Sequence, residues 1–188
     1  MSQEVAMNYD DALALMHEYT KNDSLRKHMY AVEAAMRAYA KKFGEDEELW
    51  GLVGVLHDFD YEMYPNAPDH PKKGSEILKE KGYSEEVRKT ILSHADYMNV
   101  PRDTQMAKCL FACDELSGFI IACAVVRPNK IADLEVSSVK KKMKDKAFAR
   151  NVSREDIQKG AEELGVPLDE HIRFVVEAMK GVSARLEL

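Results

Sequence analysis

The sequence predicts an all-α fold, a compact bundle of about eight or nine helices around one site. Three observations support this prediction. Apolar residues recur at spacings of three and four along most of the chain, which is the period of an α-helix. The six prolines and nine glycines among the 188 residues fall mostly between these periodic stretches. No stretch shows the alternation of apolar and polar residues that a half-buried strand requires.

The composition predicts one ordinary globular domain covering residues 1–188. Hydrophobic residues make up 45% and charged residues 32%, and the net charge of −6 gives no reason to expect nucleic acid as a partner. No apolar stretch approaches the roughly 20 residues of a membrane span, and the start lacks the pattern of a signal peptide. We therefore expect a cytoplasmic protein without a membrane partner, with three free thiols in place of disulfides.

The first long helix is predicted to begin at Asp23 or Ser24, either of which can cap it, and to end at Gly44. Three-four spacing places one histidine, His28, inside its apolar face. The inward positions are Leu25, His28, Met29, Val32, Ala35, Met36, Tyr39 and Phe43. A histidine in such a face, taken alone, is more often a hydrogen-bonded core residue than a metal ligand.

The next helix is predicted to begin near Glu45–Glu48, because acids favour a helix N-terminus, and to end at the pair His57-Asp58. A turn region over residues 59–68 follows, with prolines as breakers. Asp60 and Glu62 lie in this turn. They can orient water or a metal-bound group, but we favour solvated positions for both.

Three further helices are predicted before the chain reaches Pro128. One ends at Gly82, the next is capped by Ser84, and the third is a long apolar helix opened by Pro101. Each carries polar residues with metal-ligand chemistry on its apolar face. In chain order these residues are His70, His94 and Asp114.

The last third, residues 127–188, is predicted to be a helical extension of a core at about 25–118. Residues 137–150 hold five lysines, one arginine and one aspartate, so this segment carries +5. A solvated helix face is the better interpretation for most of these lysines. Ser153 and Asp156 form a variant of the capping box at the start of the next helix, and a terminal helix follows Pro167.

Four histidines and two aspartates are thus predicted to face the interior. An aspartate is almost never buried without a partner, and a divalent metal ion is one partner that offsets the cost. Imidazoles combined with carboxylates suit a first-row metal such as Mn, Fe, Co, Ni or Zn. The six candidate ligands are His28, His57, Asp58, His70, His94 and Asp114. The other two histidines, His17 and His171, are expected at the surface.

With these residues assembled, the sequence resembles the HD-domain superfamily of metal-dependent phosphohydrolases. The superfamily pattern is a histidine on an early helix, a His-Asp pair ending another helix, and a distant aspartate. His28, His57-Asp58 and Asp114 match it, between about residues 25 and 118. The resemblance implies that these four residues bind one metal ion.

A second stretch resembles the subset of this superfamily that binds two metal ions. It runs from His70 through Pro-Lys-Lys-Gly-Ser-Glu-Ile-Leu and is followed by His94. The resemblance implies that His70 and His94 hold a second ion, with Asp58 as the bridge. Two departures are visible. Ala95 stands where a second adjacent histidine often occurs, and Asp60 replaces the glycine of the common HDIG continuation.

The resemblance implies hydrolysis of a phosphomonoester or phosphodiester, with a small-molecule nucleotide as the expected substrate, by attack of a metal-bound hydroxide. Asp58 is then a ligand that can also accept a proton from the attacking water. Arg127 and Lys130 are candidates for contact with the phosphate. Two alternatives stay open: a di-iron oxygenase of the same superfamily, and a non-catalytic module in which the metal stabilises a ligand-binding fold.

Overall fold

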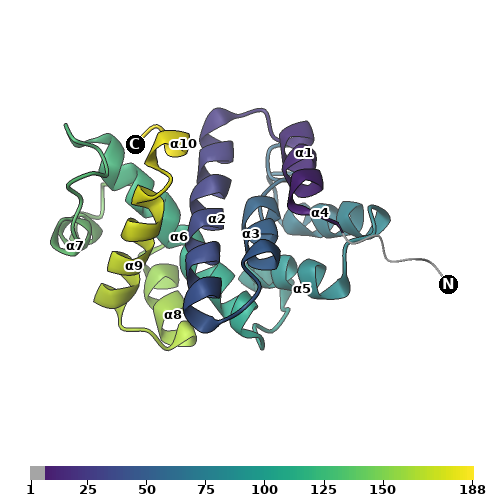
Figure 1. Ribbon diagram of the computed structural model, residues 1–188. Coiled ribbons are helices and arrows are strands. Elements are labelled where there is room, and N and C mark those ends of the chain that lie inside the picture. Colours follow the sequence, from purple (N-terminus) through teal and green to yellow (C-terminus); the bar gives the residue numbers. More distant parts are fainter. Residues whose placement is uncertain (1–6) are drawn as a thin grey trace.

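The computed structural model describes residues 7–188, and all of its regular structure in that range is helical (Figure 1). It contains ten α-helices and one short 3₁₀ helix, so the predicted all-α fold is confirmed. The count exceeds the predicted eight or nine. Helix α1 (Tyr9–Tyr19) and the four-residue α10 (Ser183–Leu186) are not among the predicted helices.

Helix α2 (Asp23–Phe43) lies at the centre of the bundle. It packs against α3 (Glu47–Leu56), α6 (Gln105–Val125) and α9 (Leu168–Lys180). Figure 1 shows α1, α3, α4 and α5 on one side of α2 and α7 to α10 on the other. The face predicted to be apolar is buried, with Met29, Val32, Ala35, Met36 and Tyr39 fully covered. Burial on both sides explains why so much of this long helix is apolar.

The remaining helices complete the two sides of the bundle. On the first side lie α4 (Asp69–Glu80), α5 (Glu85–Ser93) and the 3₁₀ helix η1 (Asp96–Met98). On the other lie α7 (Val136–Lys144) and α8 (Arg154–Leu164). Helix α8 approaches α6 closely, since a Cβ atom on Gly160 would stand only 2.7 Å from the Cα of Ala112. This contact brings the last third of the chain against the helix that carries Asp114.

Two helix starts differ from the prediction because another side chain provides the cap. The N-cap of α2 is Asn22, whose side chain accepts a hydrogen bond from the Leu25 N–H at 3.0 Å. Helix α6 begins four residues after Pro101, because the Thr104 hydroxyl accepts from the Ala107 N–H at 3.1 Å. Each cap satisfies one of the free N–H groups of the first turn.

The prediction that His171 lies at the surface is wrong. It is fully buried in α9. Its Nε2–H donates to the Ala112 carbonyl at 2.8 Å, and its Nδ1 accepts from the Tyr39 hydroxyl at 2.6 Å. Burial lowers the pKa of this imidazole, so the neutral form joins α2, α6 and α9. His17 is half-buried, and its Nε2 lies 2.5 Å from the Tyr30 hydroxyl oxygen.

All three cysteines are buried on α6 without disulfides. Within residues 7–188, no helix combines the length and apolar character needed to cross a membrane.

Gly54 sets the distance between α2 and α3, and this gives a test of the packing. A Cβ atom at this position would lie 2.8 Å from the Cα of Glu33, a backbone atom that cannot move alone. We expect Gly54→Ala to lower the free energy of unfolding by about 2 kcal/mol, against a helix-propensity gain of about 1 kcal/mol. Urea unfolding measures the change.

Gly51→Ala is the matched control, because it adds the same methyl group to the same helix. The three atoms nearest to its Cβ would all belong to the flexible side chain of Arg37. We expect a markedly smaller loss of stability for this variant. Equal stability of the two variants would contradict the role assigned to Gly54.

Candidate metal centre

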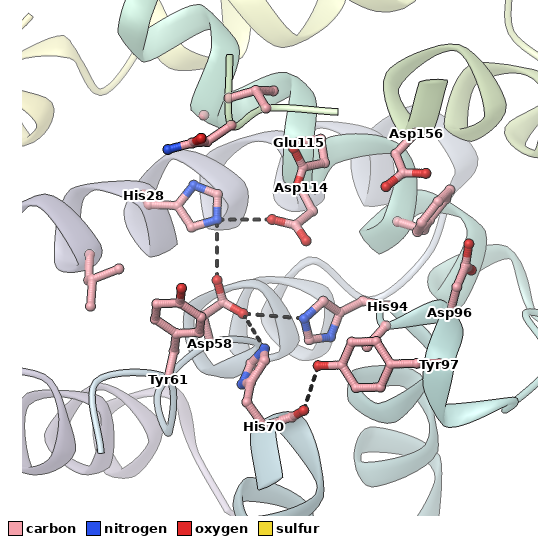
Figure 2. Close-up of a pocket in the computed structure, with 16 residues that line it drawn as sticks. His28, Asp58, Tyr61, His70, His94, Asp96, Tyr97, Asp114, Glu115 and Asp156 are labelled. Carbon is pink, nitrogen blue, oxygen red and sulfur yellow. Dashed lines mark hydrogen bonds and ion pairs between the residues drawn. The ribbon is translucent and has the colours of Figure 1, made fainter. Parts of the chain in front are cut away.

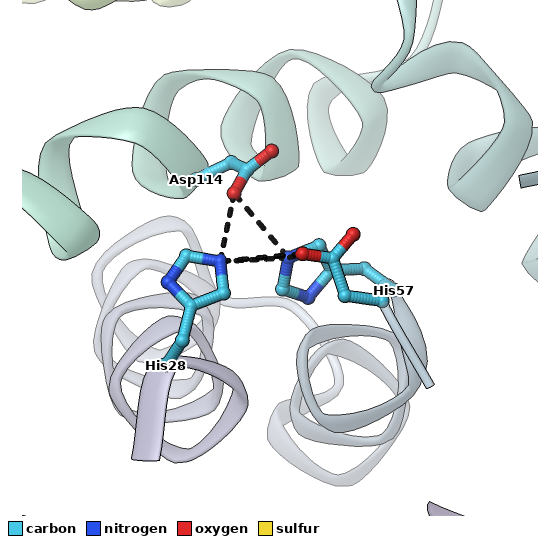
Figure 3. Close-up of side chains that lie close together, drawn as sticks. His28, His57 and Asp114 are labelled. Carbon is cyan, nitrogen blue, oxygen red and sulfur yellow. Dashed lines mark hydrogen bonds and ion pairs between the residues drawn. The ribbon is translucent and has the colours of Figure 1, made fainter. Parts of the chain in front are cut away.

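Four of the predicted residues meet where α2, α3 and α6 come together, and Figure 3 labels three of them, His28, His57 and Asp114. His28 lies on α2, His57 and Asp58 directly follow α3, and Asp114 lies on α6. The Nε2 of His28 is 2.9 Å from Asp114 Oδ1 and 3.2 Å from His57 Nε2. The Nε2 of His57 is 3.3 Å from the same aspartate oxygen. We call these four residues the first ligand group.

A second ligand group consists of Asp58, His70 and His94. Asp58 Oδ1 lies 3.2 Å from the Nε2 atoms of both histidines. Its other oxygen, Oδ2, lies 3.3 Å from His57 Nε2 and 3.5 Å from His28 Nε2. One carboxylate therefore faces both groups, one oxygen toward each (Figure 2). In each group the candidate ligand atoms all lie within 4.8 Å of one another.

Three of the imidazoles are held by a hydrogen bond at Nδ1. His57 Nδ1–H donates to the Gly54 carbonyl at 2.8 Å, and His94 Nδ1–H donates to the Ile91 carbonyl at 2.5 Å. Both carbonyls lie three residues earlier, in the last turn of the preceding helix. His70 Nδ1–H donates to Asp60 Oδ1 at 2.8 Å. These acceptors keep the proton on Nδ1 and leave the Nε2 lone pairs for a metal ion.

Asp60 corrects the prediction of a solvated loop acid. It is 1% exposed, and its second oxygen accepts from the Gly74 N–H at 2.8 Å. A Cβ atom on Gly74 would lie 2.7 Å from Asp60 Cγ, so only glycine leaves room for this carboxylate. Glu62 is exposed as expected and accepts from the Lys21 and Asn22 N–H groups. The acid at the HDIG glycine position thus orients His70.

Charge in the site is balanced between carboxylates and imidazoles. Burial by itself would raise the pKa of Asp58 and of Asp114, but the facing histidines, His57 first among them, hold both below their usual range. Burial would likewise lower the pKa of His57, and the two aspartates outweigh it and raise that pKa. A metal ion would replace the protons on these imidazoles as the positive partner of the carboxylates.

A cavity of about 500 Å³ opens onto both ligand groups (Figure 2). Aromatic and apolar walls surround part of it, and the Tyr97 hydroxyl donates to the His70 carbonyl at 2.6 Å. Besides the ligands, the cavity is lined by Leu25, Tyr61, Ala95, Asp96, Tyr97, Phe111, Glu115, Gly118, Asn151, Val152 and Asp156. Of the described residues that line it, none is lysine or arginine.

The two predicted phosphate contacts lie outside this cavity. The Nη2 of Arg127 is 3.0 Å from Asp133 Oδ1, and Lys130 Nζ donates to the Glu187 carbonyl at 2.7 Å. Both side chains therefore serve local contacts in the last third of the chain. Glu115, Tyr61 and Tyr97 were not predicted from the sequence, because no motif marks residues that meet only at a cavity wall.

The all-helical fold thus carries two adjoining His/Asp groups, each of which could hold a metal ion. A family model described as HD domain matches residues 25–118, and the chain belongs to this family. The match begins three residues before His28 and ends four after Asp114, so it contains every residue of both ligand groups. Comparison with curated proteins and with solved structures gives no match.

The role of Asp60 can be tested by replacing it with asparagine. The amide of Asp60→Asn has one acceptor oxygen, so either the His70 Nδ1–H or the Gly74 N–H loses its partner. We expect metal affinity at the second ligand group to fall by about 10–100-fold. Metal titration against a competing chelator measures this. Glu62→Gln, an exposed acid of the same turn, serves as the control and should keep the original affinity.

The raised pKa of His70 leads to a prediction of how metal binding depends on pH. Burial lowers its pKa, but hydrogen bonds to Asp58 and Asp60 outweigh burial and raise it to about 9. In the metal-free protein His70 is therefore protonated at pH 7, and an incoming ion must displace that proton. We expect affinity to rise with pH until about pH 9, by about tenfold per unit for one proton. Calorimetry in buffers of different ionisation enthalpy detects the released proton, and pH-independent affinity would contradict the assignment.

Proposed function

We propose that the protein is a metal-dependent phosphohydrolase that cleaves a phosphomonoester or phosphodiester in the cavity above the two ligand groups. The observation that carries this proposal is the shared carboxylate of Asp58, with one oxygen directed at each group. Two-metal hydrolases use such a shared ligand to hold two ions about 3.5–4 Å apart. The mixture of imidazole and carboxylate suits Mn, Fe, Co, Ni or Zn.

The donor set fits a divalent ion in each group. His28, His57 and Asp114 would hold one ion, His70 and His94 the other, and Asp58 would bridge them. When bound, such ions lower the pKa of a coordinated water from 15.7 toward about 7 and neutralise negative charge on the phosphoryl group. Among the described residues, Asp58 alone belongs to both ligand groups, which makes its carboxylate the candidate acceptor of a proton from the attacking water.

The residues that line the cavity indicate how a phosphoester would be oriented in it. Because no lysine or arginine lines it among the described residues, the phosphate has its positive partners only at the two ligand groups. The organic part of the substrate then extends between Tyr61, Tyr97 and Val152. A cavity of about 500 Å³ accepts a molecule of the size of a nucleoside monophosphate, so the nucleotide expected from the sequence remains part of this proposal.

The primary experiment is metal analysis of protein purified without added metal, followed by assays of the loaded protein. The assay panel contains nucleoside mono-, di- and triphosphates and simple alkyl phosphates. Two ions per chain and release of phosphate or of a monoester would support the proposal. Oxygen uptake with a mixed-valence iron spectrum would favour the oxygenase instead. Bound metal without turnover across the panel would favour a non-catalytic module.

Asp58 gives the sharpest test of this scheme. We expect Asp58→Ala to lose ions from both ligand groups and to reduce turnover by at least about 10³-fold, because one side chain is removed from both positions. Metal content per chain and phosphate release are the measurements, with circular dichroism to show that the variant folds. Asp69→Asn, an exposed acid at the start of α4, is the control. A folded Asp58→Ala protein with full activity would refute the scheme.

A further inference from the structure

The cavity is lined by acidic residues that belong to neither ligand group. Five of the sixteen lining residues are acids, and only Asp58 and Asp114 belong to the ligand groups. The other three are Asp96, Glu115 on α6 and Asp156 on α8, and Figure 2 shows all three on the side of the cavity away from His70. These three acids differ in whether a basic side chain pairs with them.

Asp96 is neutralised by the protein itself. Its Oδ1 lies 2.8 Å from the Nη1 of Arg102, and its Oδ2 lies 2.8 Å from the Nζ of Lys159. Neither basic residue lines the cavity. In the described part of the chain, no lysine or arginine pairs with Glu115 or Asp156. The wall therefore presents two carboxylates without a cationic partner.

Asp156 faces the cavity because Glu115 takes its expected role in a helix cap. In a capping box the third helical residue accepts a hydrogen bond from the N–H of the cap residue. Here the Ser153 hydroxyl does accept from the Asp156 N–H at 3.1 Å, but the Ser153 N–H donates to Glu115 Oε2 at 2.9 Å. The predicted capping box is thus only half formed, and the carboxylate of Asp156 is free to line the cavity.

We propose that Glu115 and Asp156 select a substrate with one phosphate and, at its other end, a protonated amine. This inference rests on the proposed function for the placement of the phosphate at the two ligand groups. It replaces the nucleotide of that proposal with a smaller phosphoester that carries an amine, because nucleobases carry no ammonium group at neutral pH. A second phosphate would meet the two unpaired carboxylates and be repelled, whereas an ammonium group would pair with them. The apolar side chains of Leu25, Phe111 and Val152 suit a short carbon chain between the two charged ends.

The test compares ligands that differ only in the amine. The probes are 2-aminoethylphosphonate and ethylphosphonate, which cannot be hydrolysed, bound to the metal-loaded protein and measured by calorimetry. We expect the wild-type protein to bind the amine at least about tenfold more tightly. Asp156→Asn should reduce this preference about fivefold or more. Glu155→Gln removes a charge from the same helical turn at an exposed position and should keep the preference.

The outcomes separate this inference from the proposed function. Equal binding of the two phosphonates by the wild-type protein, or an unchanged preference in Asp156→Asn, would overturn the inference. Tighter binding of a nucleoside triphosphate than of its monophosphate would overturn it as well. Turnover is assayed separately with 2-aminoethyl phosphate, ethyl phosphate and the nucleotides of the panel described above. If none of these is cleaved while the binding preference holds, the hydrolase proposal fails and the inferred selectivity of Glu115 and Asp156 stands.

Discussion

The carboxylate of Asp58 is the point on which the site depends. Four imidazole nitrogens, from His28, His57, His70 and His94, lie 3.2–3.5 Å from its two oxygens. These histidines come from α2, from the end of α3, from the start of α4 and from the residue after α5. A carboxylate in such a position needs positive partners, because burial of an unpaired charge costs several kcal/mol. Against the effect of burial, Asp58 and its neighbouring aspartates raise the pKa of His57 and of His70, so protons on these two imidazoles supply positive charge without metal. Divalent ions would supply it in the loaded protein.

The rest of the site is built so that these groups stay aligned. At the ends of α3 and α5, the carbonyls of Gly54 and Ile91 each accept a hydrogen bond from the Nδ1–H of a histidine three residues later and so orient its ring. His70 has no such carbonyl and relies on Asp60, which in turn requires the small Gly74 beside it. Close packing at Gly54 then holds α3 against α2, so that His57 faces His28. Close packing at Gly54 and Gly74 therefore also sets the geometry of the candidate ligands.

The charges that line the cavity bear on its substrate. Divalent ions would bring positive charge to the ligand groups, while Glu115 and Asp156 line the same cavity without a lysine or arginine partner. Helix α8 places Asp156 at the cavity because it packs closely on α6 at Gly160 and Ala112. The last third of the chain, outside the matched residues 25–118, thereby contributes to the pocket of the HD core. Arg127 and Lys130 from the same third do not reach it.

The sequence by itself determined the helical class and the residues of both ligand groups, because helical periodicity and short motifs depend on neighbours a few positions away. It assigned α2 and α3 to within about two residues and marked their histidines as inward. Only the tertiary structure decided the positions of Asp60, His171 and Asp156. Each of these side chains is placed by a partner distant in the sequence: His70 and Gly74, Tyr39 and Ala112, and Glu115 through Ser153. The packing of the helices brings these partners together, and a local sequence pattern does not predict that packing.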